Sequence, residues 1–108
     1  MPEYKKLEIK EIIESGREHT GKRIETEGVI KGEKLEGILG LRRHRVFIED
    51  EQGNRIILKM VKKGDTEIHY KKLLERMEEA KQDETEKIVL GELTKKRHYA
   101  LKVENVYS

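Results

Sequence analysis

The chain has 108 residues, of which 43% are charged and 34% are hydrophobic, and its formal net charge is only +2. So small an excess argues against a polycation that binds by bulk charge, and any electrostatic function must depend on where the charges lie. The absence of cysteine excludes disulfides, thiolate metal sites and a cysteine nucleophile. Because no apolar run reaches ten residues, we expect neither a membrane span nor a signal peptide, and we expect a cytoplasmic protein.

Three patterns follow one another in the first 41 residues. Residues 7 to 16 have apolar residues at helical spacing and end at a glycine, which predicts a short lead-in helix. Residues 22 to 31 alternate with period two and predict a half-buried strand, in which Gly28 indicates a bulge or a sharp coil. Residues 31 to 41 contain three glycines among charged side chains, and predict either a flexible hairpin connection or kinked strand extensions.

The clearest hairpin lies in the middle of the chain. Residues 45 to 49 and 55 to 61 are β-rich runs around a glycine-containing turn. Residues 66 to 81 carry apolar side chains at intervals of three and four, which predicts an amphipathic helix. Residues 87 to 93 and 99 to 107 predict two further strands. The expected core includes Ile24, Val46, Ile48, Ile56, Leu58, Leu74, Met77, Val89, Leu101 and Val103.

This order of elements is the layout of the OB-fold, and it predicts a mainly β protein: a five-stranded Greek-key barrel with one helix between strands 3 and 4 and a short N-terminal helix. We expect one domain over residues 1–108, with a helical lead-in (1–20) and the barrel (21–107). Residues 21–30, 46–53 and 91–93 also resemble the glycine and apolar spacing of OB-fold nucleic-acid-binding domains. That resemblance implies a ligand across strands 2 and 3, between the loops that join strands 1 to 2 and strands 4 to 5.

The charges are distributed as this resemblance implies. Residues 31 to 63 hold nine basic and five acidic side chains, and residues 94 to 102 hold four basic and none acidic. Residues 64 to 86, which contain the second helix, hold four basic and eight acidic side chains. Positive charge thus gathers in the two regions that would flank the ligand. The 19 glutamates against three aspartates, with few amides, are typical of proteins from hot environments.

Two basic runs, 42–45 and 95–98, two aromatic residues and two cations of the third strand make up the candidate site. Each run offers three cations and a histidine that could hold a phosphodiester backbone. Alternation places Phe47, the one phenylalanine, on the outer face of its strand, where a base could stack on it; a register error of one would bury it instead. Tyr99 is as well suited to burial at the barrel rim as to stacking. The candidate residues are Arg42, Arg43, His44, Arg45, Phe47, Arg55, Lys59, Lys95, Lys96, Arg97, His98 and Tyr99.

Catalytic and metal-binding patterns are missing from the sequence. The four histidines form no pair at i and i+4, and the two serines lie near a helix end and at the C-terminus. There is no phosphate-binding loop, and the acidic run 49–51 is typical of a solvated hairpin turn. We therefore expect no enzymatic activity, no cofactor and no metal.

The leading hypothesis is non-catalytic binding of single-stranded DNA or RNA across strands 2 and 3, between the two basic loops. Protein subunits of a nucleic-acid-processing complex are candidate further partners, and no membrane partner is expected. The alternative is an OB-fold protein-interaction subunit of a larger assembly, without direct nucleic-acid contact. In that case the two helices would be the contact elements. Fold alone does not decide between the two hypotheses, because folds of this kind carry many functions.

Overall fold

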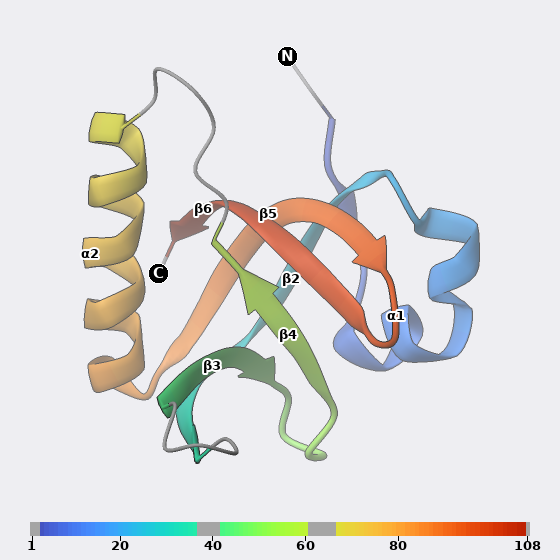
Figure 1. Ribbon diagram of the computed structural model, residues 1–108. Coiled ribbons are helices and arrows are strands. Elements are labelled where there is room, and N and C mark those ends of the chain that lie inside the picture. Colours follow the sequence, from blue (N-terminus) through green and yellow to red (C-terminus); the bar gives the residue numbers. More distant parts are fainter. Residues whose placement is uncertain (1–2, 37–41, 61–66, 108) are drawn as a thin grey trace.

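Strands dominate the computed structural model, which describes residues 3–36, 42–60 and 67–107, and the side chains of 3–32, 45–60 and 71–107 among them. Within these ranges six strands form one sheet, and α2 and α1 stand on opposite sides of it (Figure 1). The elements in chain order are β1 (Lys5–Lys6), α1 (Ile9–Ser15), the 3₁₀ helix η1 (Gly16–His19), β2 (Arg23–Glu36), β3 (Arg42–Glu49), β4 (Arg55–Lys59), α2 (Glu67–Asp83), β5 (Glu86–Lys95) and β6 (Tyr99–Tyr107).

The strand order is β1-β2-β3-β4-β6-β5, and β2 pairs with β5 as well. The long strand β2 makes this return possible, because its first half pairs with β5 and its second half, from Val29 onward, pairs with β3. Gly28 lies at the change of partner, where an added Cβ would be 2.7 Å from the Glu49 carbonyl oxygen, too close for any side chain. The pairing of β5 with β6 shifts register between Leu90 and Gly91, because their partners in β6 are Asn105 and Val103 and Glu104 is skipped.

The mainly β class predicted from the sequence is confirmed, but the count of five strands is wrong. The additional strand is β1, the first in the chain, whose two residues pair in parallel with β2. Two residues are too few for an alternating pattern, so the sequence could not reveal this strand. Of the two interpretations of residues 31 to 41, strand extension holds as far as Glu36, and residues 37–41 lie outside the described ranges.

The two helices differ from their predicted bounds. Helix α1 begins at Ile9 and passes into η1 at Gly16, whose backbone stays right-handed. Helix α2 runs from Glu67 to Asp83, two residues beyond the predicted end, and residue 66 of the prediction lies outside the described part. None of the helices in the described ranges is long and apolar enough to cross a membrane.

The core lies between the sheet and the inner faces of α1 and α2. Eight of the ten predicted core residues are buried, and Val46 is partly buried against them. Leu74 is the exception, because 37% of its surface is exposed. The buried members of the cluster are Leu7, Ile9, Ile12, Ile24, Ile30, Ile48, Ile56, Leu58, Leu73, Met77, Ala80, Val89, Leu93, Leu101, Val103 and Val106.

Helix α2 packs on the sheet through Leu73, Met77 and Ala80, and Leu74 lies on the flank of this stripe. Leu73→Ala should therefore lower the free energy of unfolding by about 2 to 5 kcal/mol, as expected for a buried leucine. Leu74→Ala removes the same atoms from an exposed position and should cost less than about 1 kcal/mol. Urea unfolding of the two variants tests the orientation of the helix, and equal losses would contradict it.

Candidate functional site

A groove of about 440 Å³ lies where α1, β3, β4 and the turn between β5 and β6 meet. Seven of the twelve predicted site residues line it, although they come from separate parts of the chain. None of the lining residues within the described ranges is acidic. The lining consists of Ile13, Arg45, Phe47, Arg55, Ile57, Lys95, Arg97, His98 and Tyr99.

The turn between β3 and β4 determines which side chains share the floor of the groove. The Asp50 carboxylate accepts hydrogen bonds from the backbone N–H of Asn54 and from its side-chain amide, each at 2.8 Å. The hydrogen bond from the side-chain amide of Asn54 holds the pKa of the Asp50 carboxyl below its usual value. The resulting register pairs Phe47 with Ile57 across the two strands, so both face the groove.

Phe47 faces the groove, as the alternation predicts, but the prediction that it is exposed is wrong. Only 7% of its surface is exposed, and it is not part of the core cluster. The Arg55 guanidinium carbon lies 4.6 Å from the centre of the Phe47 ring. The ring is thus on the predicted face and lies beneath the side chain of a neighbouring strand.

Tyr99 forms a second aromatic element at the β5–β6 turn. The Lys95 ammonium lies 4.8 Å from the centre of its ring. On another side the ring packs against η1, where a Cβ added at Gly16 would be 2.6 Å from Tyr99 Cε1. Tyr99 is partly buried against the core. Of the two roles that the sequence left open for it, burial or base stacking, the structure therefore shows burial. Gly16 is needed here for the space that the tyrosine occupies.

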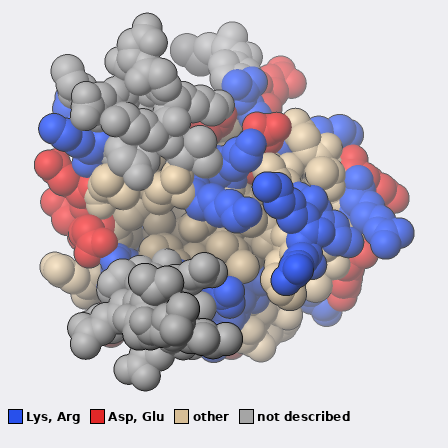
Figure 2. Space-filling view, viewed as in Figure 1, with Lys and Arg blue, Asp and Glu red and all other residues tan. Residues whose placement is uncertain are grey.

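Cations surround the opening of the groove. Arg45, Lys95 and Arg97 are all exposed. In the described part of the chain no carboxylate lies within ion-pair distance of Lys95 or Arg97. Figure 2 shows Lys and Arg side chains gathered over the β5–β6 turn. Lys95 and Arg97 therefore bring positive charge that no described carboxylate neutralises to a groove lined by apolar and aromatic side chains.

A second groove, near the start of α1, shows that the first is not basic merely because the protein is rich in lysine. It has a volume of about 650 Å³, and six of its lining residues are acidic. They are Glu8, Glu11, Glu27, Asp50, Glu51 and Glu86. Acidic side chains thus outnumber the two lysines, Lys6 and Lys10, in this groove, whereas the described lining of the first groove has no acidic side chain.

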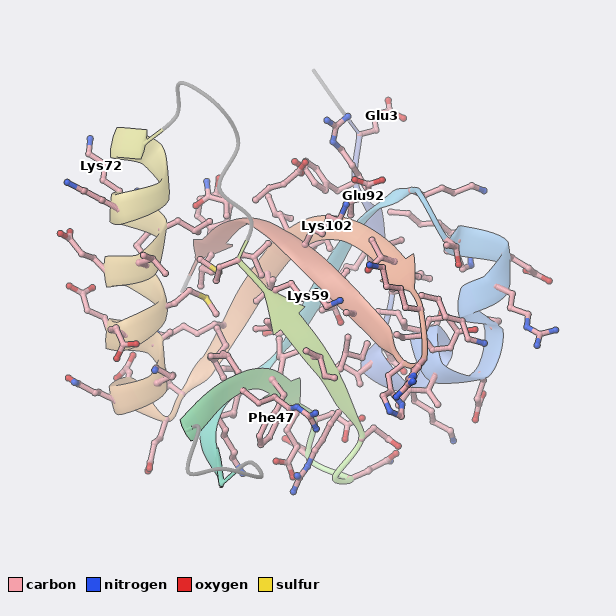
Figure 3. The ribbon with its side chains drawn as sticks, in the orientation of Figure 1. Glu3, Phe47, Lys59, Lys72, Glu92 and Lys102 are labelled. Carbon is pink, nitrogen blue, oxygen red and sulfur yellow. The ribbon has the colours of Figure 1, made fainter. Side chains whose placement is uncertain are left out.

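Two predicted site residues whose side chains the structure describes do not line the groove. Lys59 and Lys96 are exposed, and Lys59 lies apart from Phe47, at the far end of β4 (Figure 3). The side chains of Arg42, Arg43 and His44 lie outside the described residues, so their contacts stay predictions.

Two lining residues, Ile13 and Ile57, were missing from the predicted site. The alternation of β4 does place Ile57 on the outer face, so a signal for it existed. Ile13 is 42% exposed on α1, and nothing in its own segment indicates what it faces. In the described ranges no three histidine or carboxylate side chains come together to hold a metal ion.

The sequence matches no known protein-family model, and no curated protein shows significant similarity to it.

Proposed function

We propose that the chain is an OB-fold domain that binds single-stranded DNA or RNA, without catalysis, in the groove between α1, β3, β4 and the β5–β6 turn. The observation that carries the proposal is the composition of the groove. Arg45, Lys95 and Arg97 converge on an apolar floor with two aromatic rings, and none of its described lining residues is acidic.

The pairing of the strands supports the OB-fold part of the proposal. An OB-fold is a small Greek-key barrel of five strands. The five long strands pair in the order β2-β3-β4-β6-β5, and β5 pairs again with β2. Strands β4 and β6 run parallel, and α2 lies between β4 and β5 in the chain. The groove lies on the second and third of these long strands, which is the face on which OB-folds bind oligonucleotides.

The chemistry of the groove favours a single strand over a duplex. An unpaired base exposes an apolar face that can pack on aromatic or guanidinium surfaces, whereas the bases of a duplex stack on one another. The floor offers Ile13, Ile57 and the Arg55 guanidinium over Phe47 for such a base, and Lys95 and Arg97, which pair with no described carboxylate, are available to contact phosphates. A volume of about 440 Å³ lies in the range of pockets that hold a small-molecule-sized group such as a base with its sugar.

The test is a fluorescence anisotropy titration of the whole chain with labelled single-stranded DNA, single-stranded RNA and duplex DNA. Single strands should bind with micromolar or better affinity at about 50 mM salt, and about 20-fold more weakly at 200 mM, if three phosphate contacts each contribute about 0.7 to the salt slope. Duplex DNA should bind more weakly. Absence of single-strand binding at low salt would contradict the proposal and favour the protein-interaction alternative.

A further inference from the structure

Phe47 and Arg55 form a layered pair in the floor of the groove (Figure 3 labels Phe47). The guanidinium carbon lies 4.6 Å from the centre of the ring, a distance typical of a cation–π contact. The ring is 7% exposed, whereas 56% of the Arg55 side chain is exposed. A ligand that enters the groove therefore meets the outer side of Arg55 before it can reach the ring.

Glu49 restrains the same arginine from the side. Its carboxylate oxygen Oε2 lies 3.7 Å from Arg55 Nε and 3.1 Å from the ammonium of Lys31. Glu49 and Arg55 are directly opposite each other on β3 and β4. The guanidinium thus lies on the ring and within ion-pair distance of a carboxylate, and both contacts favour this position and reduce the conformational entropy that binding would cost.

Because of this ion pair, Arg55 differs electrostatically from the other cations of the groove. Glu49 offsets part of the charge of Arg55, whereas no described carboxylate lies within ion-pair distance of Lys95 or Arg97. Arg55 should therefore contribute less than these two residues to attraction for phosphate. What it offers is a flat, weakly hydrated surface, and bases stack on guanidinium planes as they do on aromatic rings.

We propose that a base of the bound strand stacks on the outer face of the Arg55 guanidinium, giving the layered order base, Arg55, Phe47. Arg55 is then the residue that contacts the base, and Phe47 and Glu49 are positioning residues. This inference rests on the proposed function and specifies which side chain receives the base. It also replaces the sequence-based expectation that the base stacks directly on Phe47.

The test compares Arg55→Lys with Arg45→Lys in the full chain, by single-strand titration at several salt concentrations. Both variants keep the positive charge and remove a guanidinium plane, but only Arg55 lies on an aromatic ring. Arg55→Lys should weaken binding about fivefold to 150-fold, the range for losing one stacked base, while the salt slope stays near that of the wild type. Arg45→Lys should change affinity less than about threefold.

Two results would overturn the inference. One is an Arg55→Lys variant that binds like the wild type, which would show that the planar group is not needed. The other is an equal loss in both variants, which would show a general preference for arginine. Circular dichroism should confirm that both remain folded, as expected for exposed side chains. Failure of the proposed function can be told apart from failure of this inference, because the wild type itself would then not bind.

Discussion

Replacing Arg45, Lys95 and Arg97 together with glutamine should weaken single-strand binding about 100-fold at 0.1 M salt. The estimate follows from three lost phosphate contacts, each contributing about 0.7 to the slope of log affinity against log salt. The slope itself should fall by about two. All three side chains are exposed, so the free energy of unfolding should change little. Anisotropy titrations across a salt series measure both quantities.

The matched control removes three cations from the exposed surface of α2 instead, namely Lys71, Lys72 and Arg76. The change in net charge is the same, and Lys72 lies on the helix, far from Phe47 (Figure 3). This control should lose only a few-fold in affinity, because exposed charges more than a Debye length of about 8 to 10 Å from the ligand are largely screened. Equal losses in the two triple variants would mean that the groove is not the phosphate-binding site.

Phe47→Ala should lower the free energy of unfolding by about 3 to 5 kcal/mol, the range for truncating a buried phenylalanine. The ring is 7% exposed and packs beneath Arg55, so its removal leaves a cavity and deprives the guanidinium of its support. Urea unfolding measures the loss. Binding should also weaken in the folded fraction, because Arg55 is then no longer held in the floor of the groove.

Ile13→Ala is the control for this variant, because Ile13 lines the same groove but is 42% exposed. Its truncation should cost less than about 1 kcal/mol. If Phe47→Ala were destabilised as little as Ile13→Ala, the ring would not be buried in the way described. A large loss of stability with unchanged affinity in the folded fraction would instead contradict the positioning role of Phe47.

The burial of Phe47 illustrates what local pattern can and cannot predict. Alternation within β3 places the ring on the face opposite Ile48, because successive side chains of a strand point to opposite sides. Whether a side chain on that face is exposed depends on what lies above it. Here part of the cover is Arg55, and its position depends on the β3–β4 turn and on Glu49. Such cover is a tertiary property that no single segment encodes.

Helix α2 presents the same limit in another form. Leu73, Leu74, Met77 and Ala80 form an apolar stripe wide enough to be buried along either edge. Only packing against the sheet decides that Leu73 is inside and Leu74 outside.

Strand β1 was missed for a different reason, since its two residues are held by pairing with β2 and carry no periodic signal.

The basic part of the site was more accessible to sequence reasoning. Segment charges place cations in the β3–β4 region and in the β5–β6 turn, and the groove joins Arg45 to Lys95 and Arg97. That convergence follows from topology: β4 pairs with β6, so the hairpin and the turn become neighbours. The contribution of α1 through Ile13 could not be foreseen, because nothing local indicates where a short lead-in helix packs.

The most direct test of the account is to map the amide chemical shifts of the isotope-labelled protein as single-stranded oligonucleotide is added. The largest changes should fall on Arg45–Phe47, Arg55–Ile57 and Lys95–Tyr99, with a smaller change at Ile13 on α1. These segments are far apart in the chain and share only the groove. Changes concentrated instead on α2 or around the acidic groove, or no changes at an oligonucleotide concentration of about 1 mM and low salt, would contradict the account.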